Sequence, residues 1–319
     1  MAGGPHTRLA NLNNAQDSTL SNILLDNLIY FYDWGLLDRG SFYNIKIPQS
    51  GIYGGDRHKL RVADDPNYAS GQVWEGYRKN WVWETGVSAT TQQPIEISGV
   101  FVDGTFRATG NVQEPYYIDY QNGRVVFDSA VDTSKTVQLE FSHKWVDVIP
   151  AEGVPFFREI QQGSFRTDEG FQVSNSGGWA QMGETRVQLP AVAVEVNPPK
   201  SLEGFQLGGG QWVNNDIIFY VMSENHWECS NLLDTILYQN ERTIHLFNPT
   251  AIAISGVFPY NYRGELNENA LPSGMYPNLI DDFPFSKCWI NSSRGNEISQ
   301  LSPDLYIGTA RCTTQVKAI

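Results

Sequence analysis

The clearest alternation of apolar and polar positions along the chain lies between residues 188 and 247. Val192, Val194 and Val196 alternate with smaller or charged neighbours, and this period of two predicts a strand with one buried face. After a loop that holds three consecutive glycines, the run DIIFYVMS predicts a second strand over 217–222. We expect the rest of the chain to be organised around this pair.

The segment after the second strand changes to the periodicity of a helix. Over 226–239 the apolar residues fall on one side of a helix, Asn225 stands at the N-cap position, and Glu228 stands where a capping-box carboxylate belongs. We therefore expect this helix to pack on the two strands, with Leu233 and Ile236 in the core.

A second helix is predicted near the N-terminus, after a polar stretch at residues 1–16. Apolar residues recur at helical spacing over 18–34. Asp17 or Ser18 can cap this helix, and Gly35 is placed to end it.

Residues 94–149 predict a compact β-module inserted into the fold. Alternating runs flank two turn pairs, Asp103-Gly104 and Asn122-Gly123, and the second pair is the strongest hairpin signal in the chain. About five strands of this length can close a small sandwich or barrel. The domain plan is then 1–93 as the first part of a core domain, the inserted module, and 150–319 as the remainder of the core.

The remaining segments divide into strands and loops. The residues 150–187 connect the module to the central unit and include a Gly-, Ser- and Asn-rich part that predicts an exposed excursion, and four prolines interrupt 259–285. Strands are predicted for ERTIHLFN, TAIAISGVF, KCWIN and LYIGTARCTTQVKA. The last of these has a face of small residues that would allow another chain to approach closely. The predicted fold is α+β and rich in β-structure: a small sheet backed by helices, with an inserted β-sandwich or barrel module.

Composition agrees with a β-rich fold and narrows the function classes. Charged residues make up 18% of the 319, while the chain holds 29 Gly, 9 Trp, 15 Tyr and 16 Phe. The net charge of −13 argues against a general nucleic-acid binder. Three scattered cysteines predict reduced thiols and folding in a cytoplasm, and no signal-peptide core or membrane span is visible in the sequence.

Sequence motifs for catalysis are absent. The chain contains no GxxxxGK[ST], GxGxxG after a strand, HExxH, GxSxG or EF-hand loop. His226, Glu228 and Cys229 are close in sequence, but on a helix they point in different directions, so capping and packing explain them better than a metal site. The adjacent pairs Asp64-Asp65 and Asp281-Asp282 neighbour prolines, and we interpret them as solvated loop charges rather than glycosidase acids. We expect no catalytic residues, no metal and no cofactor.

A dense aromatic group occupies one of the β-like segments before the module. It could form a platform on which sugars stack, but at strand spacing buried packing or a contact between subunits explains it better. Its members are Trp74, Tyr77, Trp81 and Trp83.

The order PAVAVEV, glycine-rich excursion, DIIFYVMS and capped helix NHWECSNLLDTILYQ resembles the tail-terminator and related neck proteins of tailed bacteriophages. The N-terminal run SNILLDNLIYFYD is similar to the helix that opens such chains, and YYIDYQNGRVVFDSA resembles β-insertions of phage virion proteins. The resemblance covers about half of the chain. It implies a structural protein without catalytic residues that forms a ring, commonly a hexamer, at the head-proximal end of the tail tube.

From the resemblance we expect a virion protein of the neck or tail, assembled in the bacterial cytoplasm. Its partners would be further copies of itself, other neck and tail-tube proteins, and double-stranded DNA that passes without specific binding; no membrane is expected. Two other classes stay open: a phage tail-associated carbohydrate-binding or depolymerase protein, which the aromatic excess favours, and a cytoplasmic enzyme with scattered catalytic residues.

The net charge also leads to an expectation for the channel of such a ring. A wall of Lys and Arg would hold DNA by counterion release, so we expect an acidic or mixed wall past which DNA slides. The candidates on loops beside the central unit are Asp168, Glu169, Glu203 and Asp216, and Trp81 and Trp83 are the candidates for contacts between subunits.

Overall fold

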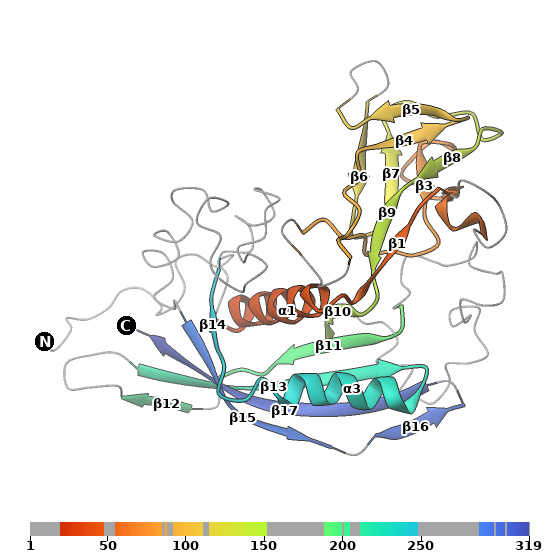
Figure 1. The fold of residues 1–319 in the computed structure, drawn as a ribbon. Coiled ribbons are helices and arrows are strands. Elements are labelled where there is room, and N and C mark those ends of the chain that lie inside the picture. The colour runs from red at the N-terminus through yellow and green to blue at the C-terminus, as the bar shows by residue number, and fades with distance from the viewer. Residues whose placement is uncertain are drawn as a thin grey trace, which may run out of the picture.

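In the part of the chain that the structure describes, the fold combines one large sheet, two helices and a smaller β-module (Figure 1). The computed structural model describes residues 20–47, 55–84, 87, 92–110, 115–151, 188–199, 201–204, 211–247, 287–296, 298–303 and 305–318. The predicted β-rich α+β character is confirmed in these residues. The predicted strand TAIAISGVF and the excursion at 152–187 lie outside them.

The large sheet is built around two long central strands. Its strand order is β10-β11-β13-β17-β15-β14, with β12 paired to β13 and β16 to β17, and every pair is antiparallel except β10 with β11. Its strands are β10 (Asp147–Pro150), β11 (Ala191–Val196), β12 (Ser201–Gly204), β13 (Gln211–Ser223), β14 (Thr243–His245), β15 (Lys287–Gly295), β16 (Ser299–Ser302) and β17 (Leu305–Ala318). The two predicted central strands are confirmed as β11 and β13, although β13 begins six residues before the predicted 217.

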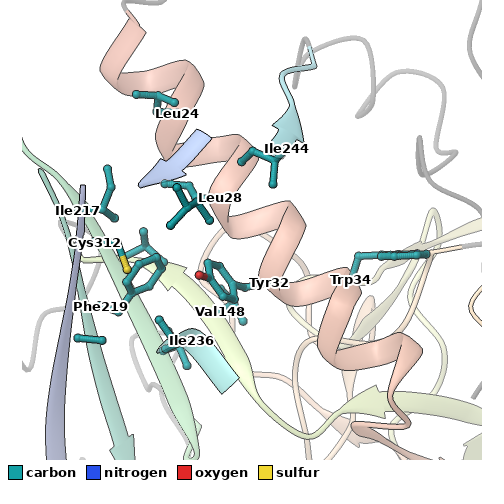
Figure 2. Packing of buried hydrophobic residues seen from close by; sticks show 14 of the residues in the cluster. Leu24, Leu28, Tyr32, Trp34, Val148, Ile217, Phe219, Ile236, Ile244 and Cys312 are labelled. Carbon is teal, nitrogen blue, oxygen red and sulfur yellow. The ribbon is translucent and has the colours of Figure 1, made fainter. Parts of the chain in front are cut away.

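Both helices, α1 (Leu20–Asp38) and α3 (His226–Leu237), pack on the same face of this sheet. Figure 2 shows Leu28 and Tyr32 of α1 pointing toward Phe219 of β13, with Ile236 of α3 at the same cluster. Because alternate residues of a strand point to opposite faces, the valine and isoleucine side chains of β13 at odd positions enter this core. The large core is therefore a two-layer core between helices and one sheet face.

Helix α1 continues past Gly35, so the expectation that this glycine ends the helix is wrong. The helix ends at Asp38, and Gly40, whose φ of 87° suits a glycine, turns the chain away from it. The Ser41 amide donates to the Leu36 carbonyl at 3.0 Å and the Gly40 amide to the Leu37 carbonyl at 2.8 Å, which is the Schellman pattern of a helix end. Leu37 is fully buried, and the burial of this last turn outweighs the cost of ~1 kcal/mol for a glycine inside a helix.

The Asn225 cap of α3 is confirmed, but the Glu228 carboxylate accepts from the Asn225 side chain at 3.4 Å rather than closing the predicted capping box. The prediction that the apolar residues share one side of this helix is wrong for Trp227, which is 74% exposed. Asn225 has an extended backbone, and its side-chain oxygen accepts a hydrogen bond from the Glu228 amide at 2.8 Å. The small-residue face of the last strand is covered by this same helix rather than by another chain. A Cβ on Gly308 would lie 2.5 Å from Leu233 Cδ1, so the missing side chain allows the helix to approach β17 closely.

The smaller β-module consists of two sheets and a two-stranded ribbon. The sheets have the orders β2-β3-β7-β6 and β5-β4-β8, and β1 pairs with β9 in the ribbon. The elements are β1 (Phe42–Ile45), a 3-10 turn η1 (Gly55–His58), β2 (Arg61–Val62), β3 (Val73–Glu75), β4 (Gly99–Val102), β5 (Thr105–Ala108), β6 (Tyr116–Asp119), β7 (Arg124–Phe127), β8 (Val137–Leu139) and β9 (Phe141–Lys144).

Strand pairing in the module crosses the predicted boundary at residue 94. Strands β6 and β7 form the predicted hairpin at Asn122-Gly123, but β7 also pairs with β3, in the register Trp74 opposite Val125. The alternation of local residues shows hairpins, while a pair between segments about 50 residues apart leaves no local signal. The module of the structure therefore includes strands from β1 onward, and β1 and β9 connect it to α1 and β10.

Replacement of Leu233 by Ala is expected to lower the free energy of unfolding by ~2–5 kcal/mol, because the side chain is 6% exposed and packs between α3 and the sheet. Leu202→Ala on β12 is the matched control, since this leucine is 60% exposed. Denaturant unfolding followed by circular dichroism measures both. An equally stable Leu233→Ala protein would show that α3 does not pack as described.

Candidate functional site

The aromatic group before the module is divided between two cores. Trp81 is fully buried in the module core, where its ring centroid lies 4.5 Å from that of Phe141 and its indole nitrogen donates to the Arg78 carbonyl at 2.9 Å. Trp74 is buried in the same core, while Trp83 is half-buried and packs against the large core. The interpretation of these residues as buried packing is confirmed for Trp74 and Trp81. Trp81 has no exposed surface that a sugar or another subunit could contact.

The acidic channel candidates are only in part within the described residues. Asp168 and Glu169 lie outside them. Glu203 pairs with Trp212 across β12 and β13, and Asp216 pairs with Thr313 across β13 and β17. Since Trp212 and Asp216 are at even positions of β13, both acids lie on the face opposite to α1 and α3. We call this the helix-free face, because neither helix of the described residues packs on it.

The helix-free face carries polar groups and half-exposed aromatic rings. Glu203 accepts a hydrogen bond from Asn214 at 3.2 Å, Asp216 accepts one from Thr313 at 3.1 Å, and Glu195 accepts one from the Tyr220 hydroxyl at 2.7 Å. Burial and the Glu195 carboxylate raise the pKa of Tyr220 to about 12. These three acids are held by hydrogen bonds on the side of the face formed by β11, β12 and β13.

A second polar feature is buried where the module joins the large core. Lys144 at the end of β9 forms ion pairs with Asp33 of α1, at 2.5 Å, and with Glu84. All three side chains are at most 10% exposed. We call these three residues the charged junction, because they connect α1, the segment before residue 87 and the module.

One lysine cannot neutralise two buried carboxylates. Burial raises the pKa of Asp33 to about 8, with the Glu84 charge adding to the effect of burial and Lys144 opposing it. Burial by itself would lower the pKa of Lys144, but the Asp33 and Glu84 carboxylates raise it above its ordinary value. We therefore describe Asp33 as the protonated member of the cluster at neutral pH.

Two further polar pairs surround the charged junction. Asn80, in a left-handed backbone conformation with φ 58°, donates a side-chain hydrogen bond to Asp147, and burial raises the pKa of Asp147 to about 6. His143 lies 2.7 Å from the Tyr77 hydroxyl, and burial lowers the pKa of this histidine to about 4. His143 is buried, while Tyr77, Asn80 and Asp147 are half-buried, and the two pairs join β9 and β10 to the segment 77–80.

The residues considered for catalysis or metal binding have structural contacts. The interpretation of Asp65 as a solvated loop charge is wrong: it is buried, accepts from the Asn67 amide at 2.9 Å and forms an ion pair with Arg124 at 3.1 Å. Glu228 accepts from the Trp145 indole at 2.9 Å, and Cys229 is buried. Asp281 and Asp282 lie outside the described residues. Within the described part of the chain, no three His, Cys, Asp or Glu side chains gather as a metal site.

The dependence of stability on pH tests the protonation of Asp33. A carboxyl group whose folded pKa is raised contributes stability at low pH and loses it as the pH rises through the folded value. His143 acts in the opposite direction below its ordinary pKa of 6.5, and Asp147 acts up to about pH 6. From pH 6.5 to 8.5 Asp33 makes the largest contribution, and the buried Cys229 and Cys288 thiols, whose pKa values burial raises, add a smaller fall near the upper end. We expect the free energy of unfolding to fall there by on the order of 1–2 kcal/mol.

Asp33→Asn is the matched variant, because the amide mimics the protonated carboxyl group. It should show only the smaller fall from the thiols between pH 6.5 and 8.5 and should equal the natural chain at pH 6.5. Denaturant titrations at several pH values measure this. If the variant is instead several kcal/mol less stable at pH 6.5, Asp33 is ionised and its pairing with Lys144 dominates.

The charged junction was not predicted from the sequence. Asp33 interrupts an otherwise apolar part of the N-terminal helix, and this is the one signal that could have marked it. Its partners lie 51 and 111 residues further along the chain, at Glu84 and Lys144, and no local pattern connects them.

Two observations on the whole chain complete this description. No helix among the described residues combines the length and the apolar character that crossing a bilayer requires. Comparison of the chain with models of protein families, with curated proteins and with solved structures gives no match.

Proposed function

We propose that this chain is a structural virion protein of a tailed bacteriophage and forms a ring at the neck or tail end, as a tail terminator or a head-tail connector component. The support from sequence is the strand-loop-strand-helix unit and the N-terminal helix, which resemble those of neck proteins. In the structure these segments lie together as β11, β13, α3 and α1 in one layered unit.

The observation that carries the proposal is the exposed part of the sheet face opposite to α1 and α3. One end of this face, around Ala191, Met222 and Leu305, is buried, while the rest presents half-exposed Trp212 and Trp289 and the exposed arginines 294 and 311. Such a face is suited to contact with another protein surface. A contact between two different faces of one chain repeats from copy to copy and closes a ring when the rotation allows it. Six copies are the expected number, from the resemblance.

The proposed partners follow from this position: copies of itself, adjacent neck and tail-tube proteins, and DNA that passes without specific binding. Glu203 and Asp216 remain the described candidates for the channel wall. The carbohydrate-binding alternative was motivated by the aromatic group, and we do not propose it because Trp74 and Trp81 lie in the module core.

The location of the protein in purified phage particles tests the proposal. Cryo-electron microscopy of particles that contain this chain should show it as a ring of cyclic symmetry between head and tail or at the tail end. Its presence as isolated copies, on fibres or nowhere in the particle would contradict the proposal. A narrowest channel lined by Lys and Arg would contradict the sliding argument and leave the neck position intact.

A further inference from the structure

The outer side of α3 carries two large aromatic side chains in the open. Trp227 is 74% exposed and Tyr238 is 79% exposed. At 100° per residue, these two residues share one stripe with Asn231 and Asp234, on the side of the helix opposite to Leu232, Leu233 and Ile236 in the core. We call Trp227, Asn231, Asp234 and Tyr238 the outer stripe.

The helix that carries the outer stripe is acidic. The segment 224–241 contains Glu224, Glu228, Asp234 and Glu241 and no Lys or Arg, and the exposed Arg242 follows it. Asp234 lies between the two aromatic residues along the stripe. A surface that combines exposed aromatic rings with one sign of charge is suited to a basic partner surface that also has apolar area.

The helix-free face offers such a surface on β15 and β17. Arg294 lies directly opposite Arg311 in the antiparallel pair, and both side chains are exposed. Two like charges in this position destabilise a sheet. Among the described residues neither arginine has an ion-pair partner. Lys287 is exposed at the start of the same strand. We call Lys287, Arg294 and Arg311 the basic strip.

A β-bulge places Arg294 on this face. The register of β15 against β17 shifts between Ile290 and Ser292, so that Ser293 pairs with Cys312 on the helix side and Arg294 turns to the helix-free side. Without the shift, Arg294 would follow Cys288 and Ile290 into the large core. The bulge therefore places Arg294 beside Arg311 on the helix-free face.

The two surfaces are compatible in length and chemistry. The outer stripe extends over twelve residues, Trp227 to the C-cap Tyr238, or ~16 Å, and lies within the ~23 Å that the basic strip extends over the eight residues Lys287 to Arg294 of β15. The indole rings of Trp212 and Trp289, with centroids 5.5 Å apart, add apolar area on the same face. A nucleic acid is the less favoured occupant, because Glu195, Glu203 and Asp216 share the face and the whole chain carries −13.

We propose that the outer stripe of α3 in one copy docks on the basic strip of β15 and β17 in the next copy, with Asp234 facing Arg294 and Arg311. The inference rests on the proposed ring and names the contact that closes it. Because the two surfaces lie on opposite sides of one sheet, each copy can use both at once. Ile218 of β13 pairs with Arg311, and Asp216 lies two residues before it. Asp216 would therefore border the contact, and Glu203 remains as the described candidate for the channel wall.

A charge exchange tests the contact. Variant A carries Arg294→Glu and Arg311→Glu, and variant B carries Asn231→Lys and Asp234→Lys. Each variant alone should associate at least about 30-fold more weakly than the natural chain, since each interface then opposes like charges. An equal mixture of A and B should associate again, because alternating copies pair opposite charges at every contact. Sedimentation velocity and native mass spectrometry measure the species.

Two controls separate association from folding. Arg39→Glu with Lys135→Glu makes the same change of charge at exposed positions outside both surfaces and should associate like the natural chain. Arg294→Glu alone converts the like-charged pair into an opposite-charged one, so it should raise the thermal midpoint of the monomer by up to about 4 °C while weakening association. A residue with a purely structural role would not change these two properties in opposite directions.

The proposed contact is wrong if variant A associates like the natural chain, if the mixture does not restore association, or if the natural chain stays monomeric at millimolar concentration. In each of these cases the proposed ring is still tested separately, by the location of the protein in purified phage particles. The contact is also wrong if variant A keeps its association but loses binding to a 30-base-pair duplex DNA, which would assign the basic strip to nucleic acid.

Discussion

Replacement of Lys144 by Met is expected to lower the free energy of unfolding by ~3–5 kcal/mol. Methionine has a similar volume, so the loss comes from charge: the Glu84 carboxylate stays buried beside the protonated Asp33 without the cation that pairs with it. The buried carboxyl groups cannot regain hydrogen bonds to water, because the surrounding core excludes it. Denaturant unfolding at pH 7 measures the change, and Lys135→Met on the exposed surface of the module is the matched control, with a change within about 0.5 kcal/mol.

Further variants show whether the loss comes from uncompensated charge. Addition of Asp33→Asn and Glu84→Gln to Lys144→Met removes the buried negative charge and should recover part of the stability. A loss below about 1 kcal/mol for Lys144→Met alone would show that the side chains reach solvent or rearrange. We also expect faster hydrogen exchange at β1 and β9 in this variant, since these strands connect the module to α1 and β10.

Replacement of Trp81 by Ala is expected to cost ~3–5 kcal/mol, because it empties a large volume in the module core and removes a hydrogen bond to the Arg78 carbonyl. The surrounding backbone is shaped to this ring: a Cβ on Gly76 would lie 2.8 Å from Trp81 Cζ2. Neighbouring strands therefore cannot close the cavity without changes of their own. Fluorescence and circular dichroism during denaturation measure the loss.

Trp227→Ala is the matched control, since this tryptophan is 74% exposed and its removal should leave the stability of the monomer within about 0.5 kcal/mol. Association of the copies should respond to the other variant: Trp227→Ala should weaken it. Trp81→Ala should leave it unchanged among the molecules that are folded. If Trp81→Ala folds with natural stability and loses association, Trp81 belongs to a subunit contact as first considered.

The buried and exposed tryptophans show why sequence predicts packing more easily than roles. Trp74, Trp81 and Trp83 have strand spacing, which favours burial of alternate residues, but spacing does not tell which core receives them. Trp81 enters the module core and Trp83 packs on the large core, two residues later. The assignment depends on the course of the chain between two layers, and that course follows from contacts with strands far away in sequence.

The charged junction and the basic strip were not predictable for the same reason. Asp33, Glu84 and Lys144 come from three separate segments, and each alone resembles an ordinary surface charge. Arg294 and Arg311 become neighbours through a register that includes a bulge, and a shift of one residue exchanges the two faces of a strand. Neither feature produces a periodic pattern.

Local signals determined a definite part of this fold. The alternation in PAVAVEV and DIIFYVMS, the Asn225 cap with Glu228, and Asn122-Gly123 each correspond to an element in the structure, because backbone periodicity, capping and turn geometry involve neighbouring residues only. The end of α1 was missed, since burial of Leu37 and the Gly40 turn outweighed Gly35. Tertiary structure alone decided that both helices share one sheet face, that β3 joins β7, and that a buried lysine connects the two parts, because these depend on which distant surfaces exclude water together.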